Sequence, residues 1–401
     1  MIKTNHIGDS FIFGVIVLFI GSIIRIGASI YLPAMSLIGE EFHINSSMMS
    51  DTLSIYFIIF AFFILVAGVL SDTYGRKPVL IAGMLFFIVG SAVCGISENY
   101  TTLMAGRAIQ AFGASMIPGT LMAMIRDACS DMRVVSLMGW LSVLSGLFLV
   151  VAPMIGGVLT YFINWRANFW FLVIFTFAVF VITLFKIPET HTKRTENQIT
   201  LKSVFSLTLT MITSAKFTFV LMPAVIFFVI QGVFLSLAPY IVMGKYGLSP
   251  VLFGVSNIFI VIGLFIGRWI GAYLFKQHGG IYVYHIGAYS SFFVSVLFLS
   301  LFFDTIFNLW SFLIINGIFA AVFGMISPIS MKSSITAFRS NSGIAAALQG
   351  ASLLGAAALG SLTVGFIVRK APDLDVQSIF AIFSALFCLM SILPLLRSKP
   401  E

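Results

Sequence analysis

The sequence predicts an all-α integral membrane protein with twelve transmembrane helices, arranged as six plus six. Of its 401 residues, 60% are hydrophobic and only 9% are charged, whereas a typical soluble domain carries about 25% charged residues. Apolar runs of roughly 20 residues, the length needed to cross a bilayer, recur along the chain. One long polar stretch, residues 187–216, interrupts these runs near the middle. A water-soluble chain could not bury so much apolar surface, so a membrane is expected.

The apolar runs divide the chain into three parts. We expect residues 1–186 to form one six-helix bundle, 187–216 a cytoplasmic linker loop, and 217–401 a second six-helix bundle. The first run is longer than the ~7–15 residues of a signal-peptide core, so we expect it to be retained as a helix. The expected spans are 11–34, 50–70, 78–96, 101–124, 135–160, 167–186, 217–242, 251–274, 281–303, 309–329, 342–368 and 377–396.

The basic residues indicate the orientation in the membrane. With the N-terminus in the cytoplasm, fifteen Lys and Arg residues fall in loops on the cytoplasmic side and four fall on the other side. Because cytoplasmic loops are enriched in Lys and Arg, this bias predicts that both termini are cytoplasmic. We expect a multi-pass protein of the cell inner membrane, in contact with lipid. The net charge of +8 follows from this sorting, so it does not indicate a nucleic-acid partner.

Several function classes lack their sequence signatures. The chain has no HExxH, no GxSxG and no GxxxxGK[ST], so it is not expected to be a membrane enzyme or to use ATP within this polypeptide. Its three cysteines have no metal-binding spacing, and we expect neither a metal nor a cofactor. An ion channel would need a selectivity filter and usually oligomeric symmetry. Two similar halves in one chain instead fit a transporter that moves a small solute by alternating access, working as a monomer.

Three arginines lie inside the expected helices, where charge is costly and usually functional. Arg107 is about two turns into the fourth helix, and Arg268 lies in the inner third of the eighth, where a structural role is expected. Arg25 lies well inside the first helix. It either faces the substrate or pairs with Asp51, near the outer end of the second helix.

Six motifs carry a resemblance to a known family. They are Tyr31-Leu-Pro-Ala34, Gly68 to Pro78 (GVLSDTYGRKP), the set Leu103, Arg107, Gln110 and Gly113 with Arg126-Asp127 after it, Pro153-Met-Ile-Gly156-Gly157, Gly247-Leu-Ser-Pro250, and Ser342 to Gly350. With these motifs the sequence resembles the major facilitator superfamily, and within it the Bcr/CflA (bicyclomycin-resistance-type) drug exporters. The resemblance implies a major facilitator fold and proton-coupled efflux, with Arg107 involved in proton coupling.

The resemblance also implies gating residues. In the family, the acid at Asp72 faces the N-terminus of the eleventh helix, where Ser340, Asn341 and Ser342 could cap; the alternative is that this loop only sets topology by its charge. Pro153, Gly156 and Gly157 would bend the fifth helix and allow close packing, although the family has further glycines where this chain has Phe148 and Ala152. The expected gating residues are Asp72, Gly75, Arg76, Lys77, Arg126, Asp127, Pro153, Gly156 and Gly157.

An absent acid predicts the substrate class. Related exporters of cationic drugs carry an acid two residues before Tyr-Leu-Pro, where this chain has Ser29, and no other Asp or Glu lies deep in an expected helix. A cation binder needs negative charge to replace lost hydration, whereas arginine suits carboxylates and phosphates. We therefore expect an anionic or carboxylate-bearing substrate. The alternatives are a carboxylate-siderophore importer or exporter and, less favoured, a cationic multidrug/proton antiporter. Asp51 and Arg107 are the candidates for proton coupling.

Polar residues at mid-helix depth could complete the substrate site. Since helices 1, 4, 7 and 10 line the cavity in the superfamily, the resemblance implies such a role for several of them. Each could equally form an interhelical hydrogen bond, worth about 0.6 kcal/mol on average. The candidate substrate residues are Arg25, Arg107, Gln110, Gln231, Tyr240, Asn316 and Gln349.

Overall fold

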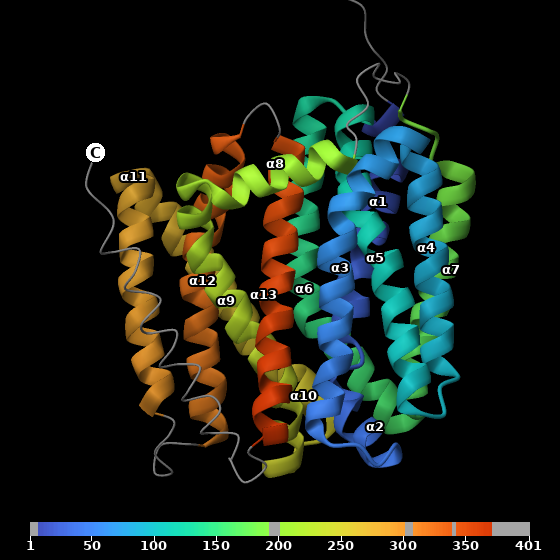
Figure 1. The fold of residues 1–401 in the computed structure, drawn as a ribbon, viewed down its shortest axis with the longest axis vertical. Helices are drawn as coiled ribbons and strands as arrows, with labels where there is room; N and C mark the ends of the chain where they lie inside the picture. Colours follow the sequence, from blue (N-terminus) through green and yellow to red (C-terminus); the bar gives the residue numbers. More distant parts are fainter. Residues whose placement is uncertain (1–6, 192–200, 301–307, 339–341, 371–401) are drawn as a thin grey trace, which may run out of the picture.

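The fold is a bundle of long helices that run up and down along one direction, as the computed structural model shows in Figure 1. The structure describes residues 7–191, 201–300, 308–338 and 342–370, and these contain helices but no strands. The helices are η1 (Ile7–Asp9), α1 (Phe11–Ser29), η2 (Leu32–Ala34), α2 (Met35–Glu41), α3 (Ser46–Tyr74), α4 (Arg76–Gly95), α5 (Tyr100–Ala128), α6 (Asp131–Phe162), α7 (Arg166–Lys186), α8 (Leu201–Thr213), α9 (Ala215–Pro239), the π-helical η3 (Tyr240–Lys245), α10 (Pro250–Ser256), α11 (Ile258–Ser300), α12 (Leu309–Ala337) and α13 (Ser342–Lys370).

Ten helical segments within the described ranges are long and apolar enough to cross a membrane. They match the expected spans one to eight, ten and eleven. Residues 281–300 of the ninth expected span form the second part of α11, beyond a kink where Gly279 has φ 82°, and residues 301–303 lie outside the described residues. The twelfth, residues 377–396, lies outside the described residues. The prediction of a multi-pass helical membrane protein is confirmed.

The two ends of the bundle can be named by the short helices that lie there. At the α2 end, at the bottom of Figure 1, lie α2, α10 and the N-terminus of α3; at the α8 end, at the top, lie α8 and the junction of α3 with α4. Asparagine side chains start two of the long helices at the α2 end. Asn45 accepts a hydrogen bond from the N–H of Met48, and Asn99 accepts one from Thr102, each at 2.9 Å. Such caps satisfy backbone donors that a helix leaves free at its first turn.

Glycines allow several helix pairs to approach closely. Gly263, Gly267 and Gly271 recur every fourth residue on α11, and a Cβ at any of them would overlap the backbone of α12. Gly90 on α4 lies against the backbone of α5 in the same way. Small residues at this spacing are the usual solution in lipid, where van der Waals contact drives helix association.

Helix α8 lies within the segment expected to be a linker loop. It has 13 residues, which is too few to span a bilayer, so the length of its apolar run does not distinguish it from a loop. Val204 and Met211 are buried on one side, whereas Phe205, Leu209 and Ile212 on the other side are exposed. The spacing of each set is helical, and α8 contacts α9, α13 and α3.

Helices α1–α7 lie together on one side of the bundle and α9–α13 on the other (Figure 1). We call these the N-half and the C-half. They meet along two seams, α3 against α13 and α6 against α10. Any group that must respond to both halves has to lie near one of these seams or between them.

Candidate functional site

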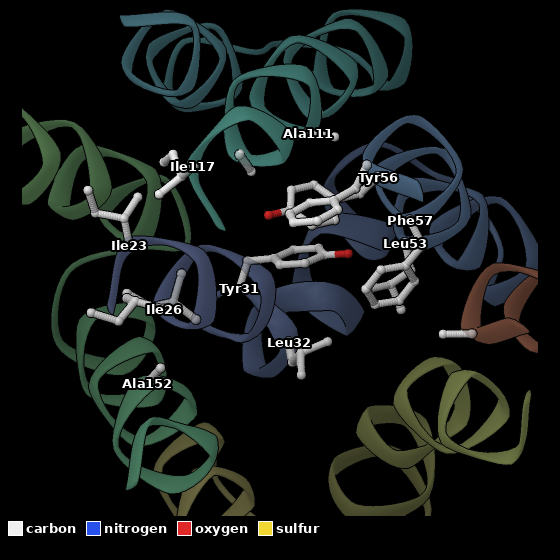
Figure 2. Close-up of a cluster of buried hydrophobic side chains, with 14 of the residues drawn as sticks. Ile23, Ile26, Tyr31, Leu32, Leu53, Tyr56, Phe57, Ala111, Ile117 and Ala152 are labelled. Carbon is white, nitrogen blue, oxygen red and sulfur yellow. The ribbon is translucent and has the colours of Figure 1, made fainter. Parts of the chain in front are cut away.

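Arg107 lies at the centre of a closed cage in the N-half. It projects from α5 and is fully buried, and its guanidinium carbon lies 4.2 Å from the ring centres of both Tyr31 and Tyr56. Figure 2 shows these two rings facing each other across a gap, one from the chain after α1 and the other from α3. Each ring face attracts the cation, an interaction worth about 0.5–2 kcal/mol.

The cage leaves part of the guanidinium without partners. Arg107 Nη1 donates to Gln110 Oε1 and, at 3.4 Å, to the carbonyl of Gly27. Gln110 in turn donates to Ser91 Oγ at 2.8 Å. Nε and Nη2 of Arg107 are buried with no hydrogen-bond acceptor, and no carboxylate pairs with it in the described part of the chain. A buried charge without a counter-charge is costly. Arg107 would therefore be stabilised by a bound anion, or by a conformation that exposes its guanidinium to water.

Arg25 occupies a different environment from Arg107. Its side chain is exposed to solvent although protein surrounds it, and its charge interacts with Arg268 of the C-half and with Tyr56. Neighbours from both halves place it between them and away from the outer surface of the bundle. The alternative that Arg25 pairs with Asp51 is wrong. Arg369 takes that place, donating to the two Asp51 oxygens at 3.0 and 3.2 Å.

The Asp51–Arg369 ion pair belongs to a polar seam between α3 and α13 at the α2 end. Ser47 Oγ donates to the carbonyl of Gly365 at 2.7 Å, and Ser361 Oγ donates to the carbonyl of Ser50 at 2.9 Å. With the ion pair, these contacts tie the halves together over about two turns of α13 and about one turn of α3. A transporter that opens at this end must break all of them.

Two variants test how much the Asp51–Arg369 ion pair stabilises the contact between α3 and α13: a neutral replacement of Arg369 and an exchange of the two charges. We expect Arg369→Gln to raise the labelling rate of a cysteine placed at Ser54 by about two- to fivefold. Ser54 is buried and lies one turn further from the α2 end than Ser50. This range corresponds to the ~0.5–1 kcal/mol of a partly exposed pair. The double exchange Asp51→Arg with Arg369→Asp should restore the slow rate. If the double exchange labels as fast as the single variant, the pair does not hold the seam.

The glycines of the Pro153 motif close the second seam. A Cβ at Gly156 would overlap the carbonyl of Ile30 in the N-half, and one at Gly157 would overlap the carbonyl of Pro250 in the C-half. Gly254 of α10 meets the backbone of Met154 in the same way. Pro153 lies inside α6, which continues as a helix through it. Backbone contacts therefore seal this side of the α2 end, with no room for a side chain.

The loop motif between α3 and α4 forms a charged network at the α8 end of the N-half. Arg76 pairs with Asp72 and, at 3.2 Å, with Asp127. Gly75 has φ 102°, a conformation that favours glycine. Glu189 accepts hydrogen bonds from the backbone N–H groups of Arg76 and Lys77, both at 3.1 Å. This carboxylate thus caps α4 and complements its positive dipole end.

The remaining gating candidates make fewer contacts. Lys77 Nζ donates to the carbonyl of Leu184 at 2.8 Å, whereas Arg126 is exposed. Asp72 has its described partner, Arg76, within the N-half. Ser340 and Asn341, the expected caps of the eleventh helix, lie outside the described residues, as does the side chain of Ser342. The proposed contact of Asp72 with that helix therefore stays a prediction.

The four polar candidates of the C-half are scattered. Asn316 is buried and donates to the carbonyl of Phe312 in its own helix at 2.8 Å. Gln349 Oε1 and the Tyr240 hydroxyl are buried atoms without hydrogen-bond partners, and Gln231 is half-buried. Tyr240 lies at the α2 end near Gly39. Among the described residues, no hydrogen bond joins these side chains to the Arg107 cage, although Tyr240 is near enough to Tyr31 for their hydroxyl groups to interact electrostatically.

A cavity of about 380 Å³ lies at the α2 end, beyond the seams. Glu40 is its one charged lining residue, and no candidate substrate residue lines it. The cavity is thus separate from the arginines. Its lining residues are Ser36, Leu37, Glu40, Thr160, Tyr161, Met243, Gly244, Leu248 and Pro250.

Sequence reasoning missed several residues of the site. Tyr56 has no distinguishing signal in a chain with 11 Tyr and 43 Phe, and Tyr31 was noticed only as part of a motif. Arg369 was counted as a loop charge because its partner lies 318 positions away in the sequence. Glu189 could have been found, because an acid shortly after α7 is available to cap a neighbouring helix.

Comparisons with known proteins agree with this architecture. The family model described as Major Facilitator Superfamily matches residues 17–329. The Multidrug resistance protein MdtL of Shigella dysenteriae is 29% identical over 202 residues, covering 49% of this chain and 52% of that protein. MdtL of Escherichia coli O157:H7 is 30% identical over 202 residues with the same coverage. The match spans about half the length of these curated relatives.

Solved structures resemble the chain over nearly its whole length. The peptide transporter POT in complex with sulfate has a TM-score of 0.77 at 16% identity, covering 99% of this chain and 98% of that one. The D-xylose-proton symporter has a TM-score of 0.69 at 13% identity, with 95% and 97% covered. At these identities the likeness concerns the fold alone. The fold and the family model, which covers most of the sequence, lead to the same assignment: the chain belongs to the Major Facilitator Superfamily.

Proposed function

We propose that this transporter exports a small anionic or carboxylate-bearing solute by alternating access, on a branch that resembles the Bcr/CflA drug exporters. The observation that carries the proposal is that the exposed Arg25 and the caged Arg107 both interact electrostatically with Tyr56, with no carboxylate paired to either arginine among the described residues. Guanidinium groups bind carboxylates and phosphates through paired hydrogen bonds. The similarity to multidrug resistance proteins supports export.

The replacement of the helix 1 acid supports the substrate class. Ser29 donates its hydroxyl proton to the carbonyl of Arg25 at 2.8 Å, so its one donor is used within α1 and it contributes no negative charge. A cationic substrate would add a third positive charge near Arg25 and Arg107. The import or export of a carboxylate siderophore is the second candidate, because it would use the same arginines and differ in the size of the solute.

We propose further that the α8 end is cytoplasmic and that the described state is closed to the outside. The excess of Lys and Arg at that end supports the orientation, and the two seams at the α2 end support the closure. Towards the α8 end, Leu65 of α3 packs against an apolar cluster that includes Leu348 of α13, so these two helices stay in contact there through apolar side chains. Asp72 and its motif would then pair across the halves in the opposite state.

Proton coupling is assigned to Asp51 and Arg107. Asp51 lies in the outer seam, so protonation would remove one charge of the Asp51–Arg369 pair and weaken closure at the α2 end. Arg107 is held by Tyr31 and Tyr56, so its release would expose a cation to the pathway. If Asp51→Asn transport remained fully driven by a pH gradient, the assignment to Asp51 would be ruled out.

The experiment that tests the proposed function is transport into proteoliposomes with an acidic lumen. We expect accumulation of citrate or of an aromatic sulfonate, neither of which crosses lipid readily, and no accumulation of glucose or tetraphenylphosphonium. Arg25→Gln should abolish anion uptake, and protein-free liposomes control for leakage. Uptake of tetraphenylphosphonium that requires Arg25 would contradict the anionic substrate class.

A further inference from the structure

Helix α6 presents one short stretch to both halves at mid-depth. Leu141 contacts α1 at Gly21, and Gly146 lies against the ring of Phe265 from α11, 3.6 Å from a Cβ built at the glycine. Ser142 lies between these two contact faces. Helical spacing puts Ser142 on the opposite side of α6 from the exposed Trp140 and Leu147, and Ser142 is itself exposed. It therefore faces the space between the halves.

Two arginines approach this stretch from opposite halves. Arg268 of α11 directs Nη1 to Ser142 Oγ at 3.4 Å. Arg25 lies one turn beyond Gly21 on the same face of α1, and its charge interacts with that of Arg268. Two like charges at this depth repel each other, more strongly than they would in bulk water. The pair is therefore unfavourable as it stands.

The sequence offers these arginines no internal counter-charge. No Asp or Glu occurs between residues 197 and 303, nor between 305 and 372. Within the N-half, the acids of the described residues lie at helix ends or in loops, apart from Asp51, which holds Arg369. Neither Arg25 nor Arg268 forms an ion pair in the described part of the chain. The missing negative charge has to come from outside the protein.

We propose that Arg25 and Arg268 form a two-guanidinium clamp, one arm from each half, that binds the oxyanion group of a ligand, with the Ser142 hydroxyl as a further donor. The ligand group is a carboxylate, phosphonate or sulfonate. This inference rests on the proposed function for the role of Arg25 and adds Arg268, which the sequence alone suggested was structural. The anion removes the repulsion between the arms, so a loaded clamp stabilises the contact that α6 makes with α11 at this depth.

The clamp can be tested by anion binding to the purified full-length protein in neutral detergent. Citrate and an aromatic sulfonate serve as soluble probes, with tetraphenylphosphonium for comparison, and ionic strength is kept constant because guanidinium contacts are screened by salt. We expect Arg25→Gln and Arg268→Gln each to weaken citrate binding at least tenfold. Lys276→Gln removes the same charge from an exposed position on α11 and should bind citrate like the wild type.

The ligand-free variants separate a clamp from a structural arginine. If Arg268 only stabilises the fold, Arg268→Gln should lower the unfolding temperature of the empty protein. If Arg268 is instead an arm of the clamp, Arg268→Gln removes its repulsion with Arg25. The unfolding temperature of the empty protein should then be unchanged or higher, and citrate should no longer raise it. Arg268→Lys, which keeps the charge but not the fork, should retain part of the binding.

The outcomes distinguish the clamp from the proposed function. Wild-type binding of citrate that Arg268→Gln leaves intact overturns the clamp and leaves the anionic substrate class standing. Binding of tetraphenylphosphonium in place of both anions overturns the two together. A lipid headgroup could supply the same oxyanion, so the measurement is repeated in nanodiscs with and without phosphatidylglycerol. Competition between this lipid and citrate that depends on Arg268 supports the clamp with lipid as an alternative ligand.

Discussion

Replacing Arg107 with methionine is expected to abolish transport while leaving the thermal stability of the protein unchanged or higher. The arginine is fully buried, two of its nitrogen atoms have no acceptor, and no described carboxylate balances its charge. Replacing a buried ion pair by apolar side chains of similar volume is often neutral or stabilising by about 1–4 kcal/mol, and Arg107 has no ion-pair partner among the described residues that its removal would leave uncompensated. Loss of the Arg107 charge removes the cation that is proposed to act in substrate binding and proton coupling, so uptake should fall to the level of protein-free liposomes. Proteoliposome uptake and the unfolding temperature of the same preparation measure both effects.

Two further variants support the interpretation of this result. Lys186→Met removes an exposed cation at the end of α7, and it should leave transport near the wild-type rate. Arg107→Lys keeps the charge but cannot fill the gap between both tyrosine rings, so transport should fall by an intermediate amount. A methionine variant that transports normally would show that the caged cation has no part in the cycle. One that unfolds at a much lower temperature would show that the cage is structural.

Replacing Gly157 with alanine is expected to shift the transporter towards a state open at the α2 end. A Cβ at this position would overlap the carbonyl of Pro250 in the opposite half, and backbone atoms cannot move aside as side chains do. Overpacking of this kind costs about 1–3 kcal/mol, which corresponds to a population change of roughly five- to 150-fold. A single cysteine at Ser54, with Cys94, Cys129 and Cys388 replaced by alanine, should react faster with a membrane-impermeant maleimide by a factor in this range.

The matched control for Gly157 lies in the same helix. Gly139 has nothing within 4 Å of a Cβ built on it, so Gly139→Ala should leave the labelling rate of the cysteine unchanged. Equal labelling of the two alanine variants would show that the α6–α10 seam does not limit opening. Loss of fold in Gly157→Ala alone is detected by size-exclusion chromatography before labelling. Gly254→Ala, whose Cβ would overlap the backbone of Met154 across the same seam, then gives an independent variant.

Much of the fold could be predicted because it depends on length and apolarity, which are local properties of the sequence. Ten of the expected spans appear as apolar helices of sufficient length. Helix α8 could not be found in this way, since it is short and has apolar residues on both sides, as Val204 and Phe205 show. A pattern of that kind is neither a spanning segment nor a polar loop.

The sequence could predict a site residue only where placing that residue in a membrane helix costs free energy whatever its neighbours are. Arg107 and Arg25 could be singled out because a charge inside a membrane helix is expensive wherever it points. Their surroundings could not, because the Tyr31–Tyr56 cage and the Asp51–Arg369 pair are contacts between distant segments. The suggested pairing of Arg25 with Asp51 used depth alone and ignored rotation about the helix, which decides the side of the bundle a residue faces.

The two seams at the α2 end differ in what their separation would leave behind. When α3 leaves α13, the serine hydroxyls, the carbonyls and the Asp51–Arg369 pair are all groups that water can solvate, and each net hydrogen bond contributes only about 0.5–1.5 kcal/mol. When α6 leaves α10, glycine surfaces separate and no hydrogen bond between side chains is lost. Opening therefore leaves few polar groups that water cannot satisfy, and its main cost is the exposure of apolar residues that the halves share, such as Phe57 of α3 and Val364 of α13. A gate built this way can keep its closed and open forms within a few kcal/mol, which a carrier that must visit both in every cycle requires.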